Sequence, residues 1–253
     1  MKIIKLEIYN YRILKNLEID IEKDLSLIIG KNNCGKTSIL SVLNKFIGDK
    51  SASNYFKYDD FNLDFKCDLY KFIEQNGSGW NAIKNKGIEL YLFIKCEDED
   101  NLSNVNKLML DLDPKNNIIV IKFEYNLSIE KMSSLVESFN QYFDRFLAKG
   151  KTCINKETCF DNFMKLKHRM FFEIKKKTLL FDTTINKPSE NEYRIIDPKV
   201  VNLDRIISFK YISARRDTIN SDSDGTLSSL STRYYEKTQT DDSNPTIQDF
   251  ECI

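Results

Sequence analysis

Residues 30–37 read G-K-N-N-C-G-K-T, which matches the complete P-loop pattern G-x-x-x-x-G-K-[ST]. The run 25–29 before it is short and apolar, as in a buried strand, and residues 38–46 carry apolar side chains at helical spacing. A strand, a glycine-bounded loop and a helix form the context in which this pattern binds phosphate. The motif uses two of only eight glycines in the chain, so a chance match in a surface loop is the weaker alternative.

The residue types of this motif predict how it would hold a nucleotide. Backbone N–H groups of residues 31–36 would converge on phosphate oxygens at the start of the helix, where the helix dipole also favours an anion. The Lys36 ammonium would reach the β- and γ-phosphates, and the Thr37 hydroxyl would ligate Mg²⁺. We therefore predict ATP and Mg²⁺ as cofactors, Lys36 and Thr37 as catalytic residues, and Thr37 as the metal ligand. The motif residues predicted to bind the nucleotide are Gly30, Lys31, Asn32, Asn33, Cys34, Gly35, Lys36, Thr37 and Ser38.

Composition narrows the class of protein. The 253 residues amount to one large domain or two ordinary ones, and an apolar content of 41% is enough to build a core. The 38 basic and 38 acidic residues cancel, so contact with DNA would need a local basic patch. No apolar stretch approaches 18 residues, and the N-terminus lacks the apolar core of a signal peptide. We expect a cytoplasmic protein without membrane contact.

Cysteine and histidine usage excludes several kinds of site. The six cysteines are scattered without a C-x-x-C pair, and the single histidine, His168, lies in a basic stretch. A zinc site, a histidine-based metal cluster and a catalytic histidine pair are therefore not expected. We expect reduced thiols, and we expect His168 to be exposed on a helix.

The segment upstream of the P-loop supports a family resemblance. Apolar residues alternate over 4–8 and over 17–21, which predicts an antiparallel pair of strands joined by a short turn that contains Asn10-Tyr11-Arg12. This opening, followed by the P-loop, resembles the ABC-type ATPases of the RecF, SMC and OLD (overcoming lysogenization defect) group, including Gabija-like members. The resemblance implies an α/β fold, namely a P-loop ABC-type ATPase lobe with a mixed sheet plus an α+β insertion. It also adds Arg12 to the nucleotide-binding residues, although a solvated arginine at a strand exit is an equal alternative.

Two further segments resemble the same group. Residues 206–217, I-I-S-F-K-Y-I-S-A-R-R-D, resemble a strand that leads into the second half of OLD and Gabija-like ATPases. Residues 58–61, Y-D-D-F, resemble the acidic turn that follows their P-loop helix, and Gln75 is the nearest candidate for a Q-loop glutamine. An ordinary strand with a basic exit remains the alternative for 206–217.

A Walker B strand and a signature loop, which such an ATPase needs for hydrolysis, are not found with full motifs. Residues 108–113 and 89–100 end in acidic residues but break the Walker B pattern, and we interpret both as sheet strands followed by solvated turns. Residues 227–231 match a signature loop only in their first two letters, within a polar segment over 217–249. We expect the chain to represent the N-terminal part of such an ATPase, ending before its second catalytic half.

We divide the chain into an N-terminal P-loop ATPase lobe (1–88), an insertion that could carry a dimer contact (89–205), and a return strand with a polar C-terminal segment (206–253). Within the insertion, residues 117–125 predict a strand, and residues 129–147 predict an amphipathic helix whose apolar stripe suits either a core or a dimer. Residues 165–177 are basic and contain aromatic residues, which fits a DNA-binding patch or, more simply, a solvated face.

The resemblance implies an ATP-binding head of an OLD/RecF-like, DNA-directed system such as phage defence or DNA repair. In the complete assembly it would hydrolyse ATP as a homodimer. From the charge balance and the basic stretch, any DNA contact is expected to be weak and to lie at 165–177. The alternative is a non-catalytic nucleotide-binding regulatory or scaffold subunit, or a truncated remnant, that partners a separate nuclease. The unmatched Walker B motif supports this alternative, so the sequence leaves open whether the chain is an enzyme.

Overall fold

The computed structural model describes residues 1–48, 54–79, 83, 86–97, 99–100, 103, 105–111, 113, 116–148 and 155–212. Nearly all of them belong to one compact unit, Met1–Ser208. Its strands are β1 (Lys2–Tyr11), β2 (Leu14–Asp20), β3 (Ile88–Lys95), β4 (Ile118–Leu127), β5 (Phe172–Asp182) and β6 (Lys187–Ile195). Its α-helices are α1 (Lys36–Ile47), α2 (Leu63–Glu74), α3 (Met132–Ala148) and α4 (Lys156–Lys167). Its short 3-10 helices are η2 (Tyr58–Asp60), η5 (Ile129–Lys131), η6 (His168–Met170) and η7 (Leu203–Arg205).

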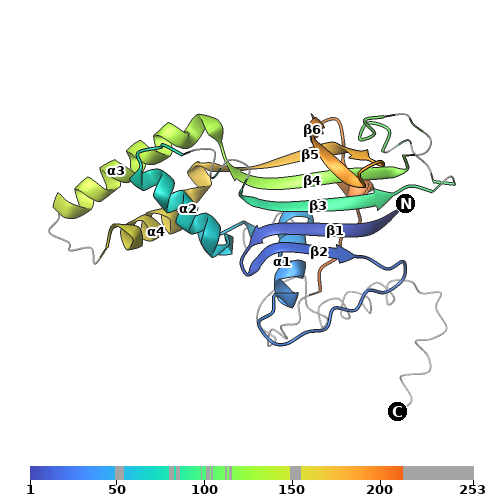
Figure 1. Cartoon of the computed structure of the whole chain (residues 1–253), viewed down its shortest axis with the longest axis horizontal. Coiled ribbons are helices and arrows are strands. Elements are labelled where there is room, and N and C mark those ends of the chain that lie inside the picture. Colours follow the sequence, from blue (N-terminus) through green and yellow to red (C-terminus); the bar gives the residue numbers. More distant parts are fainter. Residues whose placement is uncertain are drawn as a thin grey trace, which may run out of the picture. The chain divides into compact units, whose positions relative to one another are not determined.

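The strands form one six-stranded sheet in the order β2-β1-β3-β4-β5-β6 (Figure 1). Leu6 of β1 lies opposite Ile19 of β2 on one side and Leu92 of β3 on the other, so the alternating apolar residues share one face. The predicted antiparallel pair over 4–8 and 17–21 is thus confirmed. All five pairings are antiparallel, so the expectation of a mixed sheet is wrong for the described residues.

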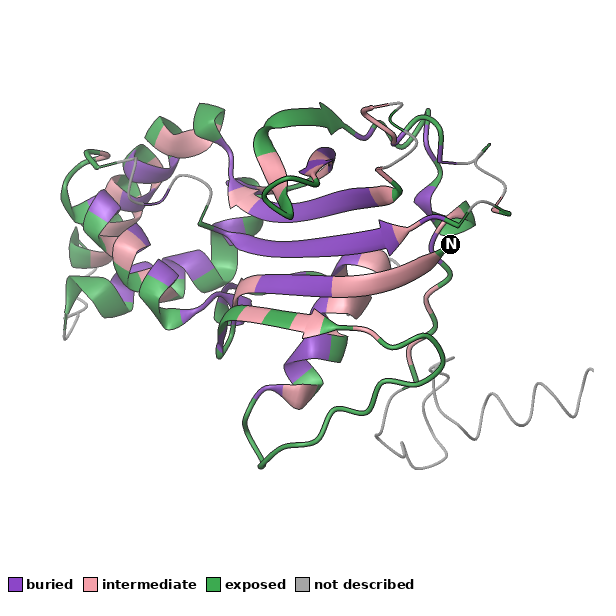
Figure 2. Cartoon of the chain, turned by 45° about the vertical axis from the view of Figure 1, so that its right-hand side comes forward, coloured by how far each residue is buried: buried purple, intermediate pink, exposed green. Residues whose placement is uncertain are grey.

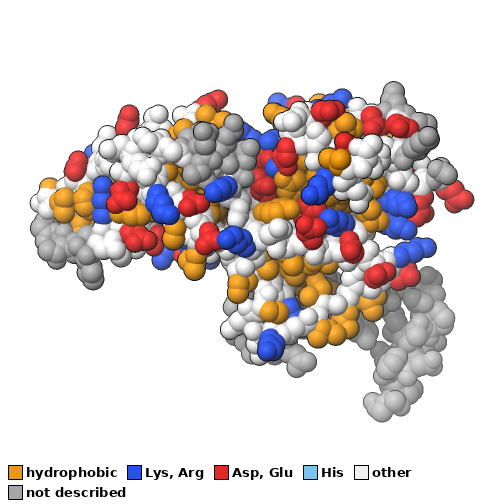
Figure 3. All heavy atoms as spheres, viewed as in Figure 1, with side chains coloured by type: hydrophobic (Ala, Val, Ile, Leu, Met, Phe, Trp, Pro, Cys, Tyr) orange, Lys and Arg blue, Asp and Glu red, His pale blue; other side chains and the backbone are white. Residues whose placement is uncertain are grey.

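The predicted strand at 25–29 is also wrong for the described structure. This segment has no strand assignment, and the side chains of Leu25, Leu27 and Ile29 are 78%, 75% and 82% exposed. Figure 2 shows the segment before α1 exposed along its length, and Figure 3 shows hydrophobic side chains gathered on this part of the surface. A strand exists only through its ladder partners, and none of the described strands pairs with this segment.

One face of the sheet carries the main core. β3 is buried along seven of its eight residues, and the apolar residues on its inner face pack with those of α1 and α2. The P-loop helix α1 contributes Ile39, Val42 and Phe46 to this core, which confirms the helix predicted over 38–46. Figure 1 shows α1 against the sheet and α2, α3 and α4 gathered beyond the strand ends.

The three outer helices form a second packing region within the same core cluster. The predicted helix over 129–147 is confirmed as η5 followed by α3. Its fully buried Phe139 lies edge-to-face with Phe160 and Phe163 of α4, at ring-centroid distances of 5.1 and 5.6 Å. The buried residues of the apolar stripe on α3 therefore belong to the core.

The opposite face of the sheet holds a smaller apolar cluster beside buried charges. Tyr91 and Phe93 of β3 pack there with residues of β4 and β5. Lys122 of β4 is 2% exposed and lies among the carboxylates of Glu89, Glu124 and Glu190. β6 supplies Glu190, so this edge strand contacts the charges of the second face.

The expectation of an exposed His168 is wrong, because this residue is only 5% exposed in η6. Its Nδ1 lies 3.1 Å from the carbonyl oxygen of Met164, and its Nε2 lies 3.0 Å from that of Phe56. The ring thereby joins the end of α4 to the loop after α1, a long-range contact that local sequence does not reveal.

Strands predicted at 117–125 and in 89–100 are confirmed as β4 and β3. β4 and all but the first residue of β3 lie within the expected insertion 89–205, yet both are central strands of the sheet that β1 and β2 begin. The described part of the expected return strand, 206–212, has no strand assignment. The domain division itself stays a prediction.

Candidate functional site

The P-loop ends at Gly35, where α1 begins. Gly35 has φ 97°, a left-handed conformation that side chains disfavour. A Cβ atom built there would lie 2.6 Å from Leu14 Cδ2 and 3.1 Å from Ile13 Cγ2. Backbone conformation and packing therefore both require glycine, and the start of β2 lies directly against the P-loop.

The Lys36 side chain folds back over the P-loop. Its ammonium donates hydrogen bonds to the carbonyl oxygens of Gly30 and Lys31 and lies 3.7 Å from the Sγ atom of Cys34. The charge of Lys36 is thus held over the loop that precedes α1, by partners that phosphate oxygens could replace. The structure brings both ends of the predicted phosphate-binding segment together around this side chain.

The start of α1 fits a phosphate group and its metal. The N–H groups of Ser38 and Ile39 donate to the carbonyl oxygen of Gly35, and helix geometry leaves earlier N–H groups at the open end. Thr37 is exposed there, as are residues 30–34, so its hydroxyl is accessible to a cation. The described residues contain no cluster of three or more His, Cys, Asp or Glu side chains suited to a metal.

Arg12 lies in the turn between β1 and β2, next to residues that contact α1. Tyr11 is fully buried, and its hydroxyl is 2.8 Å from the Ser41 hydroxyl on α1. Arg12 has φ 52°, and its guanidinium binds Asp60 of η2. Sequence reasoning identified 58–61 only as a turn and missed Asp60 as the partner of Arg12. The paired acids of Y-D-D-F were the available signal.

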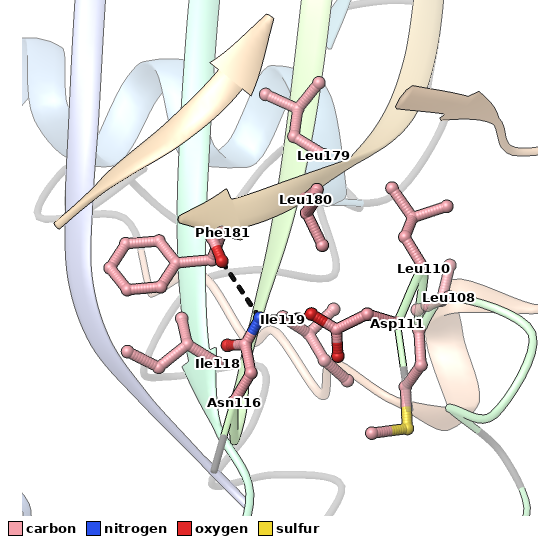
Figure 4. A pocket seen from close by; sticks show the side chains of 10 residues that line it. Leu108, Leu110, Asp111, Asn116, Ile118, Ile119, Leu179, Leu180 and Phe181 are labelled. Carbon is pink, nitrogen blue, oxygen red and sulfur yellow. Dashed lines mark hydrogen bonds between the residues drawn. The ribbon is translucent and has the colours of Figure 1, made fainter. Parts of the chain in front are cut away.

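The segments that weakly resemble Walker B do not form one in the described structure. Residues 105–111 form turns rather than the strand we expected before Asp113. The Asp111 carboxylate accepts hydrogen bonds from Asn116 Nδ2 at 2.8 Å and from the Asp113 N–H at 3.1 Å. Figure 4 shows Asp111 beside Asn116, and both line a small pocket together with Leu108 and neighbouring residues of β4 and β5. Asp111 therefore stabilises its own loop.

The remaining acidic and polar candidates lie in ordinary positions. β3 ends at Lys95, and Glu97 after it pairs with Lys2 at 3.1 Å, as expected for a strand followed by a solvated turn. Gln75 is the C-terminal cap of α2. The signature-like segment 227–231 and the polar segment 217–249 lie outside the described residues.

The basic stretch 165–177 is distributed over α4, η6 and β5 rather than gathered on one helix. Lys165 lies 3.8 Å from Asp59, and Arg169 stacks 4.8 Å from the Tyr55 ring centre. Lys177 of β5 pairs with the buried Glu124. Several side chains of the stretch therefore contact other residues of the protein, which favours a partly solvated surface with a structural role.

A glycine-bounded loop that ends in Lys-Thr at a helix N-terminus, with the lysine folded over it, defines the class of P-loop nucleotide-binding proteins. The chain belongs to the AAA ATPase domain family, whose model matches residues 1–251.

A curated relative, Endonuclease GajA of Bacillus cereus (strain HuB5-5), is 33% identical over 117 residues, which covers 42% of this chain. The match spans only 17% of that relative's length. The resemblance to P-loop ATPases of the OLD and Gabija type is thus confirmed by the family model and this relative together. In the described part of the chain, no helix is long and apolar enough to cross a membrane.

Proposed function

We propose that the chain binds MgATP through residues 30–38 and serves as the ATP-binding head of an OLD-like, DNA-directed system in the cytoplasm. The resemblance to OLD and Gabija-like ATPases points to phage defence or DNA repair as the role of that system, and the likeness to Endonuclease GajA supports its direction at nucleic acid. The observation that carries the proposal is the position of the Lys36 ammonium over the loop at the start of α1. That arrangement joins a cation, free helix N–H groups and an exposed threonine hydroxyl at one point.

Each group would have a separate task at this site. The Lys36 ammonium would exchange the Gly30 and Lys31 carbonyls for the oxygens of the β- and γ-phosphates. The N–H groups at the start of α1 would neutralise the remaining phosphate charge, and Thr37 would ligate Mg²⁺. Bound MgATP would supply the γ-phosphoryl group and the divalent charge. Arg12, in the neighbouring turn, would contribute a second cation.

Replacement of Lys36 tests nucleotide binding directly. Lys36→Ala should weaken MgATP binding at least tenfold, about 1.4 kcal/mol, because the variant loses its cation at the phosphates. Lys31→Ala is the matched control: it removes a lysine from the same loop but keeps the backbone N–H group, so its affinity should change little. Isothermal titration calorimetry should separate the two variants. Equal affinity in the wild type and Lys36→Ala would contradict the proposal.

Hydrolysis by this chain alone should be very slow. In-line attack on the γ-phosphate needs a carboxylate that orients water and charge from a facing subunit. Asp111, the first candidate for such a carboxylate, accepts hydrogen bonds within its own loop. We therefore propose that turnover requires a homodimer or a further subunit, such as a separate nuclease. The non-catalytic regulatory or scaffold role stays the alternative.

A steady-state ATPase assay distinguishes these roles. The purified chain should turn over ATP well below the roughly 1 s⁻¹ at the low end of common enzymes, with or without DNA. A faster rate would show that a water-orienting carboxylate is present after all. In that case Asp111→Asn and Asp113→Asn would be the first variants to assay.

A further inference from the structure

Asp60 is a buried carboxylate that lies between the turn containing Arg12 and the helix of the P-loop. It ends η2 and is only 2% exposed. Its Oδ1 atom accepts a hydrogen bond from Arg12 Nε at 2.9 Å and lies 2.8 Å from the Arg12 Nη2 atom. Its Oδ2 atom accepts from the Lys57 N–H at 2.8 Å and lies 3.2 Å from the Lys45 Nζ atom of α1.

The backbone of Arg12 is held by the same turn. The Arg12 N–H donates to the Asp60 carbonyl oxygen at 2.8 Å, and Asn62 Nδ2 donates to the Arg12 carbonyl oxygen at 2.6 Å. The φ of 52° at Arg12 is uncommon for a residue with a side chain, and these bonds hold it in place. Both the main chain and the guanidinium of Arg12 are therefore oriented by residues 60–62.

The residues on either side of Arg12 contact the P-loop and its helix. The residue before it, Tyr11, contacts α1 through Ser41, and Ile13 and Leu14 after it lie against Gly35. The Arg12 side chain is 42% exposed, so part of its guanidinium remains accessible while Asp60 binds Nε and Nη2. A guanidinium has five N–H donors, which leaves donors for a second anion.

We propose that Asp60 is a positioning residue for the nucleotide site, which fixes the Arg12 guanidinium beside the P-loop so that it can bind the phosphates of ATP. The proposal deepens the proposed function and rests on it. Its physical basis is preorganisation: an arginine already held in one rotamer loses less side-chain freedom when the nucleotide binds. Asp60 would thus act on the nucleotide only through Arg12.

A double-mutant cycle in MgATP affinity tests this directly. Asp60→Asn keeps the shape of the side chain but weakens its hold on the guanidinium, and it should reduce affinity about three- to tenfold. Arg12→Gln should reduce affinity at least as much. If Asp60 acts on the nucleotide through Arg12 rather than through Lys45 of α1, the loss in the double variant should equal that of Arg12→Gln alone. Asp64→Asn, which removes an acid from the exposed pair with Lys15, is the matched control and should bind like the wild type.

The outcomes separate this inference from the proposed function. If Lys36→Ala loses ATP affinity but Asp60→Asn binds like the wild type, Asp60 has no positioning role. If the Asp60→Asn loss persists in full in the Arg12→Gln background, Asp60 acts through the fold, for example through Lys45, and the inference is overturned. If the wild type and Lys36→Ala bind ATP equally, the proposed function itself fails. If a thermal melt shows that Asp60→Asn does not fold, Asp60→Glu takes its place in the same cycle. The loss of MgATP affinity caused by Asp60→Glu must then also disappear in the Arg12→Gln background.

Discussion

Lys122 shows how a single charge can be accommodated inside this sheet. Its Nζ atom lies 3.3 Å from Glu89, 3.1 Å from Glu124 and 3.0 Å from Glu190, although the residue is 2% exposed. Burial by itself would lower the pKa of Lys122, but the three carboxylates outweigh it and raise that pKa above its ordinary value. An unpaired charge at this depth would cost several kcal/mol, so the carboxylates are a structural requirement.

Among these carboxyl groups, Glu89 should make the free energy of unfolding depend on pH. Burial raises the pKa of Glu89 to about 7, opposed by Lys122 and increased further by the other carboxylates. Because the folded state holds this proton more tightly than the unfolded state does, the group's contribution to stability is present below about pH 4.5. It is lost as pH rises to about 7.

Glu89→Gln removes that proton and keeps an acceptor for Lys122. Its melting temperature relative to wild type should therefore increase from pH 5 to pH 8. Each kcal/mol corresponds to about 2–4 °C for a domain of this size. Thermal melts of both proteins across this range measure the effect, and a difference independent of pH would contradict it.

Among the secondary-structure elements, α3 and α4 depend most visibly on aromatic packing. Phe139 of α3 and Phe160 and Phe163 of α4 are all fully buried. Asn155 caps the N-terminus of α4 by accepting a hydrogen bond from the Glu157 N–H. The cap begins α4, whereas the aromatic contacts determine which of its faces meets α3.

Phe139→Ala should destabilise the protein by about 3–5 kcal/mol, since it leaves a cavity between two packed helices. Phe146→Ala on the same helix is the control, because removal of this half-buried side chain should lower the free energy of unfolding clearly less. Equilibrium urea unfolding measures both changes. Similar losses for the two variants would show that the α3–α4 contact contributes little to the core.

For the whole molecule, charge balance argues against strong, general attraction to DNA. The 38 basic and 38 acidic residues cancel, and the basic stretch 165–177 engages acidic and aromatic partners such as Asp59 and Tyr55. Contact with DNA through this stretch should therefore be weak and sequence-independent, and should depend on a few bound phosphates.

A charge-removal variant tests that contact. Combined replacement of Lys165, Lys167 and Arg169 by Ala should weaken DNA binding and reduce the salt slope by about 1 for each phosphate that the variant no longer binds. Replacement of Lys2, Lys5 and Lys15 removes the same charge from β1 and β2 and serves as the control. Fluorescence anisotropy over a salt series measures both. An unchanged slope in the first variant would assign 165–177 a purely structural role.

Local sequence patterns predict many of the secondary-structure elements of this chain. The motif at 30–37, the helix after it, the alternating strands β1 and β2 and the amphipathic α3 depend on periodicity and short motifs, which act within one turn or one strand. The sequence alone therefore predicts the phosphate site and the antiparallel pair.

Only the tertiary structure decides which distant groups meet. Asp60 reaches Arg12 across 48 residues of sequence, and the buried His168 ring meets the carbonyl oxygen of Phe56, which is 112 residues away in sequence. The run 25–29 has the composition of a buried strand, yet it stays exposed because pairing depends on other strands, and none of those described supplies it. Local sequence sets what each segment can form, whereas hydrogen bonding and burial between remote segments determine what it does form.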